Sequence, residues 1–203
     1  MRTRLSRHDR KSEILAHARE AFQRRGFANT EMEDIRKACG ISRGGLYHHF
    51  ANKVAILDAI AGEDVERLAE SLTRRDCPPI ELLVETGSIH IGNDPGILPA
   101  LESVEEKIAY LSGFELASAR RLGPLLGARL AGWVAPGIDP EHVAEMFLTI
   151  NSHINRRVCL GDWNEARAAG FAATALKTLA TVLRDASRLA PIIAALEERE
   201  RAQ

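Results

Sequence analysis

The chain has 203 residues, a formal net charge of -1 at pH 7 and 45% hydrophobic residues. This length suffices for a small domain followed by a larger body with its own core. No apolar run approaches the ~20 residues of a membrane span, and the charged first residues are unlike a secretory signal. We therefore expect a cytoplasmic protein and exclude an integral membrane protein.

Charge is distributed unevenly along the chain. Residues 1–60 hold 12 Lys or Arg against 7 Asp or Glu, whereas residues 61–203 hold 15 against 21. A basic N-terminal part predicts a nucleic-acid-binding domain there. Five cations precede the first expected helix, and they either follow the DNA backbone or its minor groove, or form a solvated tail: Arg2, Arg4, Arg7, Arg10 and Lys11.

Residues 27–53 predict two short helices joined by a tight turn. The first should start at Thr30, whose side chain would form a capping box with Glu33. Gly40 would end it in the left-handed conformation, and Ser42 would cap the second helix. This arrangement is typical of a helix-turn-helix, which places its second helix in the major groove of DNA.

The second helix should have one buried face and one exposed face. Leu46 and Phe50 are four residues apart and would face the core. Gly44 and Gly45 each cost about 0.8–1 kcal/mol of helix propensity relative to Ala. Close approach of the backbone to DNA is one reason to keep them, and a frayed first turn is the alternative.

The segment at about residues 10–57 resembles the DNA-binding domain of the TetR family of bacterial one-component regulators. The family pattern is an apolar helix, then G-F-x-x-T-T, then I-A-x-x-A-G-V-S-x-G-x-L-Y-x-H-F-x-x-K. The matching residues are Ile14, Leu15, Ala18, Ala21, Phe22, Gly26, Phe27, Thr30, Ile35, Ala38, Gly40, Ile41, Ser42, Gly44, Leu46, Tyr47, His49, Phe50 and Lys53.

The resemblance implies an all-α fold in two domains. Residues 1–53 would form a basic arm and a three-helix DNA-binding domain, with the helix-turn-helix at about residues 31–50. Residues 54–203 would form a helical domain for ligand binding and dimerisation. The implied function is a homodimeric repressor, not an enzyme, which a small-molecule effector releases from a palindromic operator.

The resemblance also assigns DNA contacts. Arg43 would read a guanine through O6 and N7, and His48 would reach a base edge. Tyr47, His49 and Lys53 would hold phosphates. The full implied set is Thr30, Arg36, Arg43, Gly44, Gly45, Tyr47, His48, His49 and Lys53.

Three positions depart from the family pattern. Glu31 replaces a threonine that supports a phosphate contact, and its carboxylate would repel phosphate. Arg36 replaces a small residue and would project to the surface as an extra phosphate contact. Gly45 lacks the methyl group with which a Thr or Ala could touch thymine.

Helical patterns continue after Lys53, over about residues 54–72, 80–91, 97–111, 114–134, 140–158, 164–183 and 191–201. Gly113, Gly123–Pro124 and Gly127 are expected to break or kink them. The helices at 140–158 and 164–183 are apolar on more than one face, which predicts either a partner subunit or burial within one subunit. By resemblance the dimer interface comprises Phe147, Ile150, Ile154, Ala168, Ala172, Ala175, Leu176 and Leu179.

By resemblance, the body also holds a pocket for an effector of unknown class. Its expected lining is Leu68, Glu85, Ile89, His90, Tyr110, Phe114, Trp133, Phe147 and Asn151. A ligand that fits better when the helix at 54–72 is tilted would move apart the two helix-turn-helix domains of the dimer, called the DNA readers below. The affinity for DNA would then fall.

Other functions remain open. Cys39, Cys77 and Cys159 lack the spacing of a metal site or disulfide framework, yet they or the histidines could serve a redox- or metal-responsive regulator. An enzyme would need an arrangement of residues such as His90, His142 and His153, but no catalytic or nucleotide-binding motif accompanies them. A DNA-binding protein without an effector, such as an activator or nucleoid protein, is a third alternative. We expect no cofactor and no metal.

Overall fold

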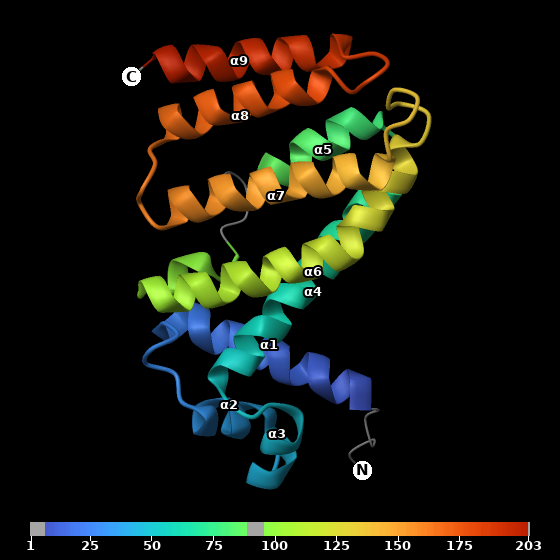
Figure 1. Ribbon diagram of the computed structural model, residues 1–203. Helices are drawn as coiled ribbons and strands as arrows, with labels where there is room; N and C mark the ends of the chain where they lie inside the picture. The colour runs from blue at the N-terminus through green and yellow to red at the C-terminus, as the bar shows by residue number, and fades with distance from the viewer. Residues whose placement is uncertain (1–6, 89–95, 203) are drawn as a thin grey trace. The chain divides into compact units, whose positions relative to one another are not determined.

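The computed structural model describes residues 7–88 and 96–202, which fold mainly into helices (Figure 1). In these residues a single extended pairing occurs, the isolated bridge between Val134 and Leu183. The helices are α1 (Arg7–Arg25), α2 (Met32–Cys39), α3 (Arg43–His49), α4 (Lys53–Arg74), α5 (Pro79–Ser88), η1 (Leu98–Ala100), α6 (Val104–Leu130), α7 (Pro140–Cys159), α8 (Glu165–Ala180), η2 (Ser187–Leu189) and α9 (Ala190–Arg201). The all-α fold predicted from the sequence is confirmed.

The chain divides into two compact units. The first comprises Met1–Glu63 and Pro95–Gly113, and the second comprises Asp64–Asp94 and Phe114–Gln203. Both α4 and α6 therefore contribute residues to both units. The boundary expected after residue 53 lies inside the first unit, to which the completely buried Ile56, Leu57 and Ile60 of α4 belong.

The first unit packs around α1. The apolar residues that the sequence pattern placed on one face, Ile14, Leu15, Ala18 and Phe22, are all buried. The Phe22 ring lies 4.9 Å from the ring of Phe27 in the following loop. Of the expected basic arm, Arg2 and Arg4 lie outside the described residues, whereas Arg7, Arg10 and Lys11 lie within α1. Helix α1 therefore begins earlier than the sequence pattern predicted.

Helix α6 is continuous, and the breaks predicted at Gly113, Gly123–Pro124 and Gly127 are wrong. A Cβ atom at Gly113 would lie 2.5 Å from Asp58 Oδ1 of α4. A Cβ atom at Gly127 would lie 2.8 Å from the Glu141 Cα of α7. These glycines allow neighbouring helices to approach closely, and this packing holds a helix that local propensity alone would interrupt.

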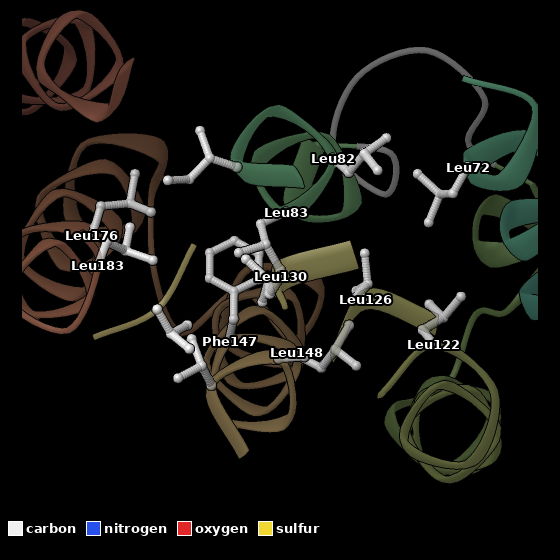
Figure 2. Packing of buried hydrophobic residues seen from close by; sticks show 14 of the residues in the cluster. Leu72, Leu82, Leu83, Leu122, Leu126, Leu130, Phe147, Leu148, Leu176 and Leu183 are labelled. Atoms are coloured by element: carbon white, nitrogen blue, oxygen red, sulfur yellow. The ribbon is translucent and has the colours of Figure 1, made fainter. Parts of the chain in front are cut away.

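The second unit has its own apolar core. Phe147 of α7 lies in the same buried cluster as Leu83 of α5, Leu130 of α6 and Leu176 of α8 (Figure 2). Helix α8 lies between α7 and α9, as Figure 1 shows. Within the described part of the chain, no helix is both long and apolar enough to span a membrane.

Helix α9 covers part of the alanine-rich surface of α8. Ala169, Gly170 and Ala173 are buried, and a Cβ atom at Gly170 would lie 2.1 Å from Glu200 Oε1 of α9. Lys177 forms an ion pair with Glu197, which ties the two helices together at their charged edge. Part of the surplus apolar surface that predicted a partner subunit is therefore used within the chain.

Candidate nucleic-acid interface

The start of α2 differs from the sequence prediction. Thr30 is completely buried, and its hydroxyl donates to the carbonyl of Gly26 at 2.8 Å. The residue before the helix is instead Glu31, whose backbone N–H donates to Asp34 Oδ2 at 3.0 Å. Thr30 therefore fixes the loop between α1 and α2. This corrects both its predicted capping role and its predicted contact with DNA, because a buried hydroxyl cannot reach the backbone of DNA.

The turn between α2 and α3 has the predicted form. Gly40 adopts the left-handed conformation, with φ 60° and ψ 37°. Ser42 Oγ accepts a hydrogen bond of 3.1 Å from the backbone N–H of Gly45 and so caps α3. Leu46 and Phe50 are buried, as their spacing predicted. Helix α3 is therefore anchored on one side and held at its start.

The opposite side of α3 faces solvent. Arg43, Gly44, Tyr47 and His48 are exposed, with Tyr47 at 44%. The guanidinium carbon of Arg43 lies 5.6 Å from the centre of the Tyr47 ring. A Cβ atom at Gly44 would meet nothing within 4 Å. The exposed side of α3 therefore presents a cation, an aromatic hydroxyl and bare backbone.

Gly45 and His49 have surroundings that the sequence did not reveal. A Cβ atom at Gly45 would lie 3.2 Å from Ser42 Oγ, so the cap itself limits the residue at this position. His49 is half-buried, and its ring centre lies 5.5 Å from that of His48 and 6.5 Å from that of Phe50. Both residues thus take part in the internal packing of α3.

Lys53, predicted to hold a phosphate, has internal partners. Its Nζ donates to the carbonyls of Phe27 at 2.8 Å and Ala28 at 3.2 Å. The same Nζ lies 4.7 Å from the centre of the Phe27 ring. Lys53 therefore ties the start of α4 to the loop that follows α1, a role that only the folded geometry reveals.

Arg36, predicted as an extra phosphate contact, is also engaged internally. Its Nε and Nη2 donate to the two carboxylate oxygens of Glu33 at 2.8 and 2.7 Å, and its Nη1 donates to the Ile41 carbonyl at 2.7 Å. The hydrogen bond from Arg36 lowers the pKa of Glu33, and the same bond raises the pKa of Arg36. The guanidinium lies along the protein surface instead of projecting from it, with 27% of the side chain exposed.

A shallow concavity of about 380 Å³ opens between α2 and α3. Its lining comprises Glu31, Met32, Glu33, Arg36, Arg43, Leu46 and Tyr47. The carboxylate of Glu33 is neutralised by Arg36, which leaves Glu31 and Arg43 to dominate the local charge. The concavity therefore carries charges of both signs.

Known proteins resemble this part of the chain most strongly. Residues 14–60 match the family model of bacterial regulatory proteins of the tetR family. Residues 14–60 therefore resemble the helix-turn-helix region of TetR-family regulators. The chain is 47% identical over 57 residues to the transcriptional regulator UidR of Escherichia coli K12, a match that covers 28% of this chain and 29% of UidR. It is 38% identical over 65 residues to the repressor Rv1474c of Mycobacterium tuberculosis, covering 32% of this chain and 35% of that protein.

The likeness in fold extends over most of the chain. A TetR-family regulator from Pectobacterium atrosepticum superposes with a TM-score of 0.65 at 21% identity, covering 89% of this chain and 99% of that one. The TetR-family repressor FadR of Thermus thermophilus superposes with a TM-score of 0.51 at 21% identity, covering 73% of this chain and 82% of that one. The resemblance to the TetR family inferred from the sequence is confirmed.

The residues predicted to bind an effector in this TetR-like fold are divided between the units. Leu68 and Phe147 are buried in the core of the second unit, with Phe114 and Trp133 packed against it. Tyr110 is buried in the first unit. Asn151 is half-buried on α7. Ile89 and His90 lie outside the described residues, as does the side chain of Glu85.

Four buried polar atoms in the second unit lack a hydrogen-bond partner among the described residues: Ser118 Oγ on α6, Asn151 Nδ2 and Arg157 Nε on α7, and Trp163 Nε1 in the loop that follows α7. Ser118 is only 2% exposed. Native proteins rarely leave such groups unpaired without a ligand, a water or a functional reason. Ser118 was not predicted as a pocket residue, because a serine within a helical pattern gives no signal of its own.

The predicted dimer residues are largely used within the protomer. Phe147 and Leu176 belong to the main core, against which Leu179 packs. Ile154 and Ala168 form a second cluster, against which Ile150 and Ala172 pack, and Ala175 is half-buried. This corrects the prediction for Phe147, Ile154, Ala168 and Leu176, because each is at most 7% exposed within the single chain and offers little surface to a second copy.

Other residues of α7 and α8 remain exposed. Met146 is 60% exposed and Phe171 is 40% exposed. The ring centre of His153 lies 5.6 Å from that of Phe171 and 5.2 Å from that of Trp163. Met146 and Phe171 belong to the surplus apolar residues of the sequence pattern, but the predicted dimer interface did not include them.

The cysteines show no metal site. Among residues 7–88 and 96–202, no group of three or more His, Cys, Asp or Glu is placed to hold a metal ion. Cys39 is buried, and burial raises the pKa of its thiol to about 11. The reactive thiolate is therefore scarce near neutral pH.

Proposed function

We propose that this protein is a DNA-binding transcriptional regulator, and specifically a homodimeric repressor whose α3 enters the major groove. The observation that carries the proposal is the exposed side of α3. Arg43 and Tyr47 are exposed there beside the open backbone of Gly44, on a helix that Leu46 and Phe50 anchor in the core. A rigid helix presenting a cation at its start is the arrangement by which helix-turn-helix proteins read bases.

The side chains of α3 divide into two tasks. Arg43 donates to guanine O6 and N7, since its planar guanidinium matches this pair of acceptors. Tyr47 and His48, which are exposed on the same side, contact phosphates or neighbouring base edges. Thr30 takes no part, and Arg36 and Lys53 support the fold of the reader.

A dimer supplies the additional DNA contacts that a single helix-turn-helix lacks. A single small helix-turn-helix makes few contacts, whereas two copies related by a two-fold axis read a palindromic operator. The exposed Met146 and Phe171, with His153 beside the latter, provide apolar surface on α7 and α8 for a second copy. The buried residues of α7 and α8 pack in the core and so fix the position of this exposed surface.

A small-molecule effector controls the repressor. The unpaired Ser118 Oγ and Asn151 Nδ2 offer hydrogen bonds to a ligand in the second unit. FadR of Thermus thermophilus, which shares the fold, was solved in complex with lauroyl-CoA. A ligand that binds one tilt of α4 more tightly than another shifts the population away from the DNA-binding state by that difference in affinity.

A redox-responsive regulator is the alternative. Cys39 lies in the DNA reader, where oxidation would disturb α2 directly. Its burial and raised thiol pKa oppose this role, because oxidants attack the exposed thiolate. We therefore favour an organic effector.

The test begins with selection of binding sites from a random duplex library by the purified protein. Fluorescence anisotropy then compares the selected duplex with a scrambled duplex over a salt series, and sedimentation gives the stoichiometry. We expect selective binding by two protomers per duplex. Arg43→Ala should remove selectivity, whereas Arg24→Ala, which alters an exposed arginine of α1, should preserve it. Equal affinity of the unaltered protein for both duplexes would refute the proposal.

A further inference from the structure

Arg36 links two parts of the helix-turn-helix, namely α2 and the turn that precedes α3. It lies on α2, and its guanidinium spans Glu33 one turn earlier and the Ile41 carbonyl in the turn that precedes α3. We infer that Arg36 is a positioning residue for base reading: it fixes the turn before α3 and thereby aims Arg43, and it does not itself bind a phosphate. This inference rests on the proposed function.

The position of the Ile41 carbonyl explains how the effect reaches the reading helix. That carbonyl belongs to the peptide plane shared by Ile41 and Ser42, so holding its oxygen restricts the orientation of Ser42. Ser42 in turn caps α3 through its hydroxyl and the N–H of Gly45. Arg43 is the next residue, the first of α3. A small rotation of this peptide plane would therefore move the guanidinium that reads the base.

Arginine is suited to this task by its shape. The planar guanidinium carries five N–H donors in a fixed arrangement, and Arg36 directs three different nitrogens to three oxygen atoms. A lysine at this position would have a single ammonium on a flexible stem. It could not hold both carboxylate oxygens of Glu33 and the Ile41 carbonyl in the same geometry.

The charge around Arg36 opposes a phosphate-binding role. Both carboxylate oxygens of Glu33 accept from the guanidinium, so the pair is close to neutral. Arg43, by contrast, lies over the neutral ring of Tyr47. Lys37, the next residue after Arg36, is 67% exposed and approaches Glu33 only at 4.0 Å. Lys37 thus offers a matched control: a cation on the same helix without the contact to Ile41.

The experiment compares Arg36→Met, Arg36→Lys and Lys37→Met with the unaltered protein. Anisotropy measures the affinity of each for the selected and scrambled duplexes over a salt series. We expect both Arg36 variants to lose about tenfold in the ratio of the two affinities, with the salt slope unchanged. Lys37→Met should keep the ratio, because losing an exposed cation weakens binding to all duplexes alike. Glu33→Gln, which keeps the arginine, should reduce the ratio in the same direction and serves if Arg36→Met does not fold.

Two outcomes would overturn the inference. If Arg36→Lys binds like the unaltered protein while Arg36→Met loses about 0.9 in the salt slope, Arg36 neutralises a phosphate. If all variants keep the affinity ratio, the contact to Ile41 does not affect reading. Hydrogen exchange without DNA separates the failure of this inference from that of the proposed function. The Gly45 amide should exchange faster in Arg36→Lys, whether or not a selective duplex is found, and an unchanged rate would refute the mechanical link.

Discussion

Gly44 and Gly45 form a natural pair for testing whether α3 meets DNA through its backbone. They are adjacent in the first turn of α3, and each lowers helix propensity relative to alanine. The space around them differs. A Cβ atom at Gly44 would meet nothing within 4 Å, whereas one at Gly45 would lie 3.2 Å from Ser42 Oγ. Alanine at Gly44 should therefore be harmless in the free protein.

We expect Gly44→Ala to stabilise the free protein by about 0.5–1 kcal/mol, because alanine loses less backbone entropy and gains no clash. For a chain of this size the shift in Tm should be about 2–4 °C per kcal/mol. Gly45→Ala should change stability by less than about 0.5 kcal/mol, since strain at the Ser42 cap offsets the gain in propensity. Thermal unfolding of the whole protein, followed by circular dichroism, measures both variants.

The affinity of Gly44→Ala for DNA should fall, although its stability rises. If the Gly44 backbone lies against DNA, the added methyl group should cost about 1–3 kcal/mol, a loss of roughly 5- to 150-fold in affinity for the selected duplex. The variant would then be more stable yet a weaker binder. A Gly44→Ala protein that keeps its full selective affinity would refute close approach of this backbone to DNA and leave the glycine without a functional reason.

Three further results are expected. Phe147→Ala should lower the free energy of unfolding by about 3–5 kcal/mol in urea titration, since the ring lies in the core of the second unit, and a loss below about 1 kcal/mol would contradict that packing. Iodoacetamide at pH 8 should leave Cys39 of the folded protein unmodified, because burial raises its thiol pKa to about 11, and rapid labelling seen by mass spectrometry would disprove its protection. The lowered pKa of Glu33, held by Arg36, contributes stability that is present above the ordinary value of 4.5 and is lost as pH falls through the folded value. Tm measured against pH should therefore fall less steeply in acid for Glu33→Gln than for the unaltered protein, and parallel curves would oppose this linkage.

The elements of the reader could be predicted from the sequence because their determinants are local. Gly40 ends α2 in the predicted left-handed conformation, and Ser42 caps α3 through the predicted hydrogen bond. Leu46 and Phe50 are buried as their spacing of four residues requires. Caps, turn residues and helical periodicity depend on neighbours within a few residues, so a single chain carries this information.

Partners distant in the sequence could not be predicted in the same way. The threonine at position 30 satisfies every local rule for a helix cap, yet burial directs its hydroxyl to Gly26. The Lys53 ammonium donates to the carbonyls of Phe27 and Ala28, which lie 26 and 25 residues earlier in the sequence. Gly113 would locally weaken a helix, but packing against Asp58 of α4 keeps α6 continuous.

By itself the sequence thus determined the helical class, the helix-turn-helix and its exposed reading face, because short-range spacing specifies them. Only the tertiary structure decided which polar groups remain available for DNA. Arg36 and Lys53 are cations in sequence, but in the fold Arg36 donates to Glu33 and Ile41, and Lys53 donates to the loop after α1. Internal acceptors within reach reduce the number of donors that a cation can offer to a partner, and three-dimensional packing sets those distances.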